Sequence, residues 1–178
     1  MVIHKQFFFC IVACIAGITS TAQTGPGKNL FEFDNNSSPR WSSFENITAE
    51  KGKGDMENNG AKGHPSNGIE PGETKVLLSV QGQGIINRIW ATIIDRSPEM
   101  LRSLKLEMFW DGEKKPAVSV PFGDFFGIGL GQTAAFHNAF FANPEGRSFL
   151  CFIPMPFKRG AKVQITNEFG QKIIPSFL

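Results

Sequence analysis

The stretch Leu104–Val120, LKLEMFWDGEKKPAVSV, decides the fold of this chain. From Leu104 to Trp110 apolar residues largely alternate with charged ones, and this period of two is typical of a half-buried β-strand. Asp111-Gly112 then supplies residues that favour a tight turn. Val118–Val120 repeats the alternation after the turn. The stretch therefore predicts two strands joined by a turn.

The same short pattern recurs on both sides of this stretch. Turn signals follow one another at intervals of roughly 8–12 residues, as in all-β sandwiches and barrels. The 19 glycines and 11 prolines favour turns over long helices, and only Pro98–Leu101 is expected to form a helical turn. The other predicted strands are Val76–Val80, Ile85–Ile94, Ala134–Phe141, Ser148–Ile153 and Lys162–Thr166.

Length and composition exclude several classes of protein. The chain has 178 residues, which suits one domain, or one domain with a removable leader. Hydrophobic residues make up 41% and charged residues 19%, so the chain is not wholly disordered. The net charge of +2 is too small to indicate a nucleic-acid-binding protein on electrostatic grounds.

Residues 1–22 have the pattern of a signal peptide. Lys5 precedes the apolar run Phe7–Ile18, which is shorter than the ~20 residues that a membrane span needs. Small residues up to Ala22 predict cleavage before Gln23, and hence a periplasmic or extracellular protein. A lipoprotein signal ending at Cys14 is the second interpretation. Cleavage at Ala22 leaves Cys151 as the one cysteine, which we expect to be a buried small hydrophobic residue.

The mature chain is expected to begin with a polar segment, residues 23–41, followed by one domain, residues 42–178. Residues 42–73 are rich in glycine and lack apolar periodicity. A loop of this length in a compact domain is usually functional, although a disordered surface excursion remains the alternative.

Motifs for nucleotide or metal chemistry are absent. The segment Gly54–Gly63 has neither the glycine spacing nor the lysine of a phosphate-binding loop. Gly127–Gly131 lacks the third glycine of a dinucleotide fingerprint. His64 and His137 have no neighbour at metal-ligand spacing. We therefore expect no cofactor and no metal.

Four glycine-containing turns instead combine polar and aromatic residues. Carboxylates, amides and arginine bind sugar hydroxyls, and aromatic faces pack against sugar C–H groups, so loops on a β scaffold can supply a saccharide site. The alternative for each turn is an Asp or Asn that hydrogen-bonds its own backbone. The turns are Ser43–Asn46 with Lys62–His64, Trp110–Gly112, Pro121–Gly127 and Asn143–Ser148.

Several of these sequence stretches resemble a family of secreted bacterial proteins that was long classified as a domain of unknown function. It is now glycoside hydrolase family 172, whose characterised members, difructose dianhydride-type enzymes among them, act on α-D-fructofuranosyl linkages. The matching stretches run in order along the mature chain: Ser43–Asn46, Glu57–His64, Arg88–Trp90, Pro98–Arg102, Trp110–Gly112, Val120–Gly127, Glu145–Phe149 and Ile153–Phe157.

The resemblance implies a jelly-roll fold, doubled in full-length relatives, and assembly into trimers or larger rings. It also implies retaining hydrolysis by two carboxylates, with the catalytic pair in the second half of the longer chains. The tail Ile173–Leu178 departs from the continuation expected in relatives, so we expect a truncated N-terminal half. No residue is therefore assigned as nucleophile or acid.

We expect seven residues to form part of a sugar pocket. Glu57 and Asp124 would accept hydroxyl protons, Lys62 and Arg147 would donate, and Trp110 and Phe125 would pack against the ring; His64 completes the set. The alternative is a carbohydrate-binding or assembly module without chemistry of its own. An acid pair formed by Asp55 and Glu57, which would let this chain act alone, is a third interpretation.

Overall fold

The structure, a computed structural model, describes residues 36–170 and 175–177. The chain divides into the units Met1–Ser38 and Pro39–Leu178, and every element below belongs to the second. The predicted leader, with Lys5, Cys14 and the cleavage site, lies outside the described residues.

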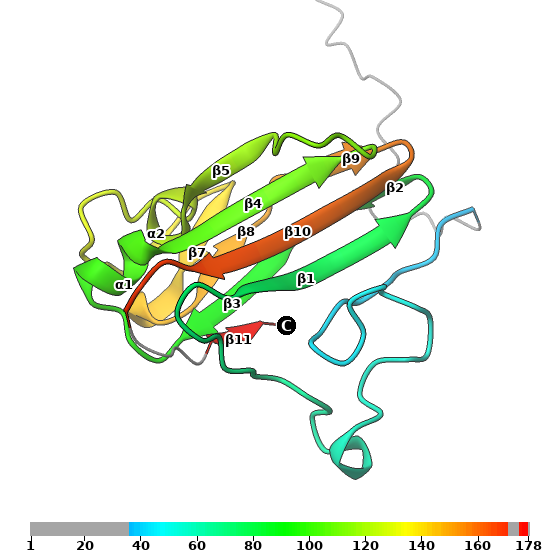
Figure 1. Ribbon diagram of the computed structural model, residues 1–178, viewed down its shortest axis with the longest axis horizontal. Coiled ribbons are helices and arrows are strands. Elements are labelled where there is room, and N and C mark those ends of the chain that lie inside the picture. Colours follow the sequence, from blue (N-terminus) through cyan, green and yellow to red (C-terminus); the bar gives the residue numbers. More distant parts are fainter. Residues whose placement is uncertain (1–35, 171–174, 178) are drawn as a thin grey trace, which may run out of the picture. The chain divides into compact units, whose positions relative to one another are not determined.

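The described chain is all-β, as the sequence predicts, with antiparallel pairing throughout its three sheets (Figure 1). One sheet has the strand order β1-β10-β4-β5, a second has β11-β3-β8-β7-β6, and β2 pairs with β9. The strands are β1 (Thr74–Gln81), β2 (Gly84–Ile86), β3 (Ile89–Ile93), β4 (Leu104–Trp110), β5 (Val118–Pro121), β6 (Phe136–His137), β7 (Phe141–Asn143), β8 (Phe149–Cys151), β9 (Met155–Phe157), β10 (Gly160–Asn167) and β11 (Pro175–Phe177).

Strand β4 has the bounds that the alternation predicts, and Leu104, Leu106 and Met108 are all buried. The prediction of one strand over Ala134–Phe141 is wrong. The side chain of Asn138 accepts the N–H groups of Phe140 and Phe141, at 2.8 Å each, and turns this segment into the β6–β7 hairpin. Such a side-chain-to-backbone turn leaves no periodic signal.

Two further differences arise from pairing between distant segments. The predicted strand Ile85–Ile94 is divided between β2, which pairs with β9, and β3, which pairs with β8. Strand β9 was not predicted, because Pro154 and Pro156 weaken the sequence signal for a strand. Strand β11, at the C-terminal end, was not predicted either.

Two short helices join the strands. Helix α1 (Pro98–Ser103) begins where Ser97 Oγ accepts the Met100 N–H, and it confirms the predicted helical turn. Helix α2 (Phe122–Phe125) was expected to be a loop. It packs against α1 so closely that a Cβ at Gly123 would lie 2.9 Å from the Cβ of Leu101. Two 3-10 turns, η1 (Asn58–Gly60) and η2 (Pro144–Gly146), lie in loops.

The core lies between the two larger sheets. Ala91 and Phe149 of one sheet join Leu104 and Ile165 of the other in a single buried cluster. The ring of Phe122 lies 4.9 Å from that of Phe126 and 5.0 Å from that of Phe149. Cys151 is buried in this cluster as expected, and burial raises the pKa of its thiol.

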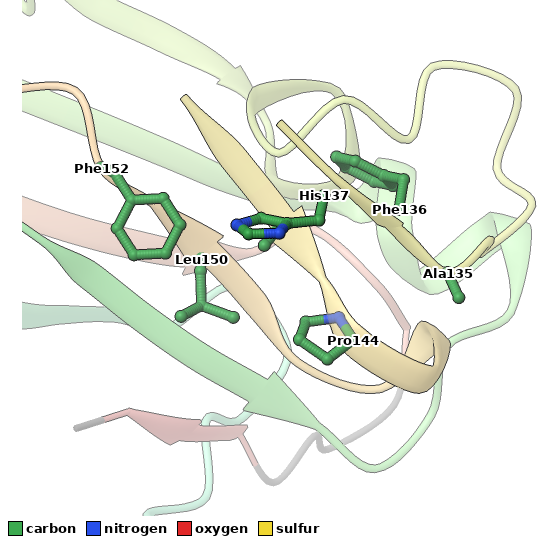
Figure 2. Close-up of a pocket in the computed structure, with 7 residues that line it drawn as sticks. Ala135, Phe136, His137, Pro144, Leu150 and Phe152 are labelled. Carbon is green, nitrogen blue, oxygen red and sulfur yellow. The ribbon is translucent and has the colours of Figure 1, made fainter. Parts of the chain in front are cut away.

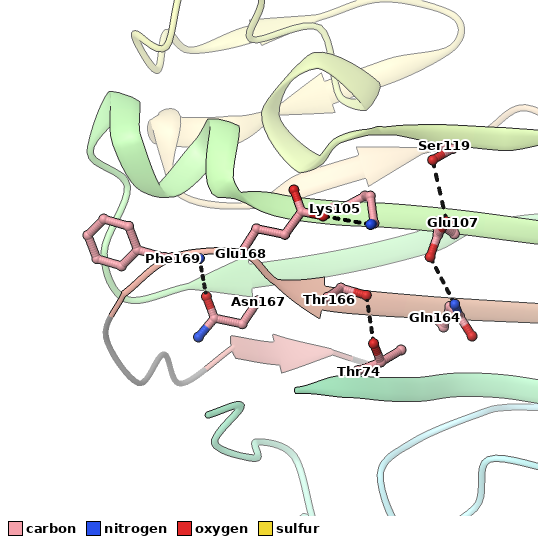
Figure 3. Close-up of polar contacts among 9 residues, drawn as sticks. All are labelled: Thr74, Lys105, Glu107, Ser119, Gln164, Thr166, Asn167, Glu168 and Phe169. Carbon is pink, nitrogen blue, oxygen red and sulfur yellow. Dashed lines mark hydrogen bonds and ion pairs between the residues drawn. The ribbon is translucent and has the colours of Figure 1, made fainter. Parts of the chain in front are cut away.

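The outer face of the β1-β10-β4-β5 sheet carries a polar ladder (Figure 3). Gln164 donates to Glu107 at 2.9 Å, and the hydroxyls of Thr74 and Thr166 lie 2.8 Å apart. Lys105 contacts Glu168 at 2.6 Å, and this carboxylate raises the pKa of the lysine. These cross-strand pairs hold the register of a solvated face.

Candidate functional site

The first part of the glycine-rich segment is fixed to the edge of β1. Ser42 Oγ donates to the Leu77 carbonyl at 2.6 Å, and the Ser79 N–H donates to the Ile47 carbonyl at 2.7 Å. The buried side chain of Asn46 donates to the Glu50 carbonyl and accepts the Glu50 N–H, both at 3.0 Å. Residues 41–50, defined here as the β1 arm, are therefore held by hydrogen bonds to β1 and within the segment itself.

Glu45 extends from the β1 arm into the following loop. One carboxylate oxygen accepts the Asp55 N–H at 2.5 Å, and the other accepts the N–H groups of Met56 at 3.1 Å and Glu57 at 2.8 Å. The Glu57 N–H is the largest of the causes that lower the pKa of Glu45; desolvation opposes them, and the other amides add to the lowering. A carboxylate that accepts several amide hydrogens stays ionised.

Gly63 closes the loop against this carboxylate. It is buried and has a φ of +53°. A Cβ at this position would overlap the Glu45 carboxylate and lie 2.9 Å from the Asp55 Cα. The close approach of Glu45 to the loop therefore requires glycine.

The loop Asp55–His64, defined here as the Glu45-held loop, brings three predicted site residues together. His64 Nδ1 lies 2.9 Å from Glu57 Oε2, with side chains 36% and 57% exposed. The ring centroid of His64 is 6.0 Å from that of Phe44, which packs against the core. Lys62 is exposed on the same loop. A carboxylate and an imidazole thus contact each other on an exposed loop that also carries an ammonium group.

Asp124 is held by a residue that the sequence analysis did not assign to the site. Arg102 Nη1 donates to both oxygens of Asp124, at 2.8 and 2.7 Å. The side chain of Asp124 is 29% exposed. An arginine 22 positions before the carboxylate gives no local signal, because the two residues meet only when α1 packs against α2.

The neighbouring Phe125 packs against other phenylalanines. Its ring lies edge-on to Phe126 at 4.9 Å and to Phe141 at 6.1 Å. It is half-buried against the core. Arg147 lies exposed after η2, and its carbonyl accepts the Thr92 hydroxyl at 2.9 Å.

Asp111, in the turn after Trp110, binds the backbone of a distant turn. Asp111 Oδ1 accepts the N–H groups of Lys158 at 2.8 Å and Arg159 at 2.6 Å. The Arg159 amide is the main cause that lowers the pKa of Asp111. The alternative to a sugar site was that Asp111 hydrogen-bonds the backbone of its own turn. Asp111 does hydrogen-bond backbone, but this backbone belongs to the turn between β9 and β10.

The fold separates the seven predicted residues into groups. Lys105 pairs with Pro121, which precedes α2, whereas Trp110 ends the same strand. At about 3.4 Å per residue these two positions of β4 are roughly 17 Å apart. The β1 arm lies at β1, and α2 follows β5 at the opposite edge of the sheet. Glu57, Lys62 and His64 share one loop, and the structure brings neither Trp110 nor Asp124 to it.

A separate hollow of about 510 Å³ lies over β6, β7 and β8 (Figure 2). The pairing places His137, Ala142 and Leu150 in one row across these strands. The β6–β7 hairpin contributes lining residues to this hollow. Because that hairpin was not predicted from the sequence, the hollow was not predicted either. Its lining residues are Ala135, Phe136, His137, Ala142, Pro144, Leu150 and Phe152.

Within residues 36–170 and 175–177, no three side chains of His, Cys, Asp or Glu gather as a metal would require. Over the same residues, no helix has the length and apolar character needed to span a bilayer.

All-β folds include lectin domains and folds whose loops bind oligosaccharides, and this all-β domain presents an exposed loop with carboxylate, imidazole and ammonium groups. Residues 61–177 match the family model described as GH172 domain-like. The chain therefore belongs to this glycoside hydrolase family. The match includes Lys62, His64, Trp110, Asp124, Phe125 and Arg147, and it begins after Glu57. Comparison with curated proteins found no match.

Proposed function

We propose that this chain is part of an exported glycoside hydrolase acting on fructofuranosyl-type glycans, and that the Glu45-held loop binds the sugar. The observation that carries the proposal is the contact between Glu57 and His64 on an exposed loop of a GH172 member. The carboxylate accepts hydrogen bonds from sugar hydroxyls, and the imidazole and Lys62 donate them. Family membership supports the glycan class.

The proposed hydrolysis retains configuration through two carboxylates. One attacks the anomeric carbon and the other serves as acid and then base, with the carboxyl groups ~5–5.5 Å apart. The acid must keep its proton until it is needed, which requires a raised pKa. The pKa values of Glu45 and Asp111 are lowered, and Asp124 is bound by Arg102. None of these three carboxylates therefore suits the role of the acid, and we assign the Glu45-held loop to sugar binding.

A Glu57→Gln variant tests the assignment. We expect it to weaken binding of an aryl α-D-fructofuranoside by about tenfold, since a hydrogen bond to a charged group is replaced by a neutral one. Titration calorimetry with the whole chain measures the affinity. Glu113→Gln, which changes an exposed carboxylate in the β4–β5 turn, is the matched control. Equal affinities for wild type and Glu57→Gln would contradict the assignment.

The second candidate function is a carbohydrate-binding or assembly module without chemistry. It is favoured by the structural contacts that occupy Glu45, Asp111 and Asp124. Saturable binding without release of the aryl group, together with a solution mass of a trimer or larger ring, supports this candidate. Aryl release that one carboxylate substitution abolishes supports the hydrolase.

Export is proposed from the N-terminal sequence alone. Expression of the full chain in a bacterium is expected to yield a protein that begins at Gln23, because the apolar run Phe7–Ile18 precedes small residues ending at Ala22. N-terminal sequencing measures this directly. A mature protein that begins at a lipid-modified Cys14 would support the lipoprotein alternative, and an uncleaved Met1 would contradict both.

A further inference from the structure

The backbone of the Glu45-held loop enters the left-handed region at several non-glycine residues. Asp55, Asn58, Asn59 and Lys62 all have left-handed φ angles, of 60°, 52°, 55° and 64°. Asp and Asn adopt this region more readily than other non-glycine residues, whereas Lys62 has no such preference, and conformations of this kind persist where surrounding contacts determine them. Contacts from a residue outside the loop therefore help to hold this conformation.

Glu45 provides these contacts, and the residues on both sides of it are packed into the protein. On one side of it Phe44 packs against the core, and on the other Asn46 is buried within the arm. Its two oxygens accept three successive amides of the loop, from Asp55 to Glu57. Gly63 lets the returning half of the loop pass against the same carboxylate. One side chain thus holds both halves of the loop.

The ionised carboxylate is the group that suits this arrangement. All three loop groups are donors, and a carboxylate only accepts. A glutamine of the same shape would direct an amide NH₂ at one or more of these N–H groups, and a protonated acid would lose acceptor capacity. The negative charge of the Glu45 carboxylate, and not only its shape, is therefore needed to accept these three N–H groups.

We infer that Glu45 is a positioning residue: its carboxylate holds the loop Asp55–His64 in the conformation that places Glu57 against His64 for sugar binding. The inference rests on the proposed function, because it assigns Glu45 a role in the same site. Glu45 acts through Glu57 and His64 and does not itself contact the sugar. It lies before the GH172 match at residues 61–177.

The role of Glu45 has a defined pH dependence. Its pKa in the folded protein lies below the ordinary value of 4.5, so its hold on the loop is complete above that value and is lost as the pH falls through the folded pKa. The loop's other titratable groups are Asp55, Glu57, Lys62 and His64.

Amide hydrogen exchange of the full chain tests the inference, with the aryl α-D-fructofuranoside as the binding probe. In Glu45→Gln we expect the amides of Asp55, Met56 and Glu57 to exchange about tenfold faster at neutral pH, and sugar affinity to fall similarly. The acid-induced loss of protection in the wild type should be absent from the variant. Glu45→Asp keeps the charge one methylene further away, so it should keep the acid transition with intermediate protection. Glu113→Gln serves as control.

The outcomes separate the inference from the function on which it rests. Unchanged exchange of the three amides in Glu45→Gln overturns the inference. Faster exchange with unchanged sugar affinity leaves Glu45 a structural residue and also overturns it. Absence of sugar binding by the wild type overturns the proposed function, and the exchange result then decides by itself whether Glu45 positions Glu57 and His64.

Discussion

Phe122→Ala is expected to destabilise the domain by about 3–5 kcal/mol, the usual cost of truncating a fully buried phenylalanine. Phe122 is 0% exposed, and its ring contacts those of Phe126 and Phe149. Its removal leaves a cavity where α2 meets β8. Small proteins have a total margin of only about 5–15 kcal/mol, so the variant should be near its limit of stability.

Thermal and urea unfolding of the whole chain measure this effect. The midpoint temperature should fall by roughly 6–20 °C, at about 2–4 °C per kcal/mol for a domain of this size. Phe140→Ala is the matched control, because Phe140 is 60% exposed and should change stability by no more than about 0.5 kcal/mol. Equal midpoints for the two variants would show that the Phe122 cluster is not the core.

Gly63→Ala is expected to displace the Glu45-held loop. The new Cβ would overlap the Glu45 carboxylate and lie 2.9 Å from the Asp55 Cα, and a backbone atom cannot move aside as a flexible side chain can. The left-handed φ of +53° adds about 1–2 kcal/mol for any residue with a Cβ. Overpacking of this kind typically adds another 1–3 kcal/mol.

Gly60→Ala separates the two causes. Gly60 has a φ of +77° in the same loop, but its added Cβ would meet only the Asp55 carbonyl oxygen at 3.7 Å, an ordinary contact. It should therefore show the backbone strain without the overlap. We expect Gly63→Ala to lose amide protection at Asp55–Glu57 and sugar affinity by about tenfold more than Gly60→Ala. Similar losses in the two variants would mean that Gly63 is needed for its φ alone.

The strands that could be predicted are those whose burial alternates along the chain. Leu104–Trp110 forms β4 with the expected bounds because its apolar residues face one core. The β6–β7 hairpin was missed because one side chain, Asn138, makes the turn. Strand β9 was missed because its pairing with β2 outweighs the weak propensity of a proline-rich segment.

The candidate site was predictable in residue type but not in arrangement. Glu57 and His64 were expected in a sugar site, and the loop does bring them into contact. Glu45 was part of a candidate turn and of a matching stretch but was not assigned a role, although its carboxylate accepts three amides of the loop. Arg102, which binds Asp124, was not assigned to the site. These partners are 10–12 and 22 positions apart, beyond any local periodicity.

The sequence by itself determined that this chain is an all-β member of a glycoside hydrolase family. Alternating apolar and polar residues indicate the strands, and short stretches that resemble the family occur in order along the chain. Only the tertiary structure decided what each carboxylate does. Glu45, Asp111 and Asp124 have similar side chains, yet each is satisfied by a different distant partner. The physical reason is that the electrostatic state of a carboxylate depends on the donors that folding brings within about 3 Å of it.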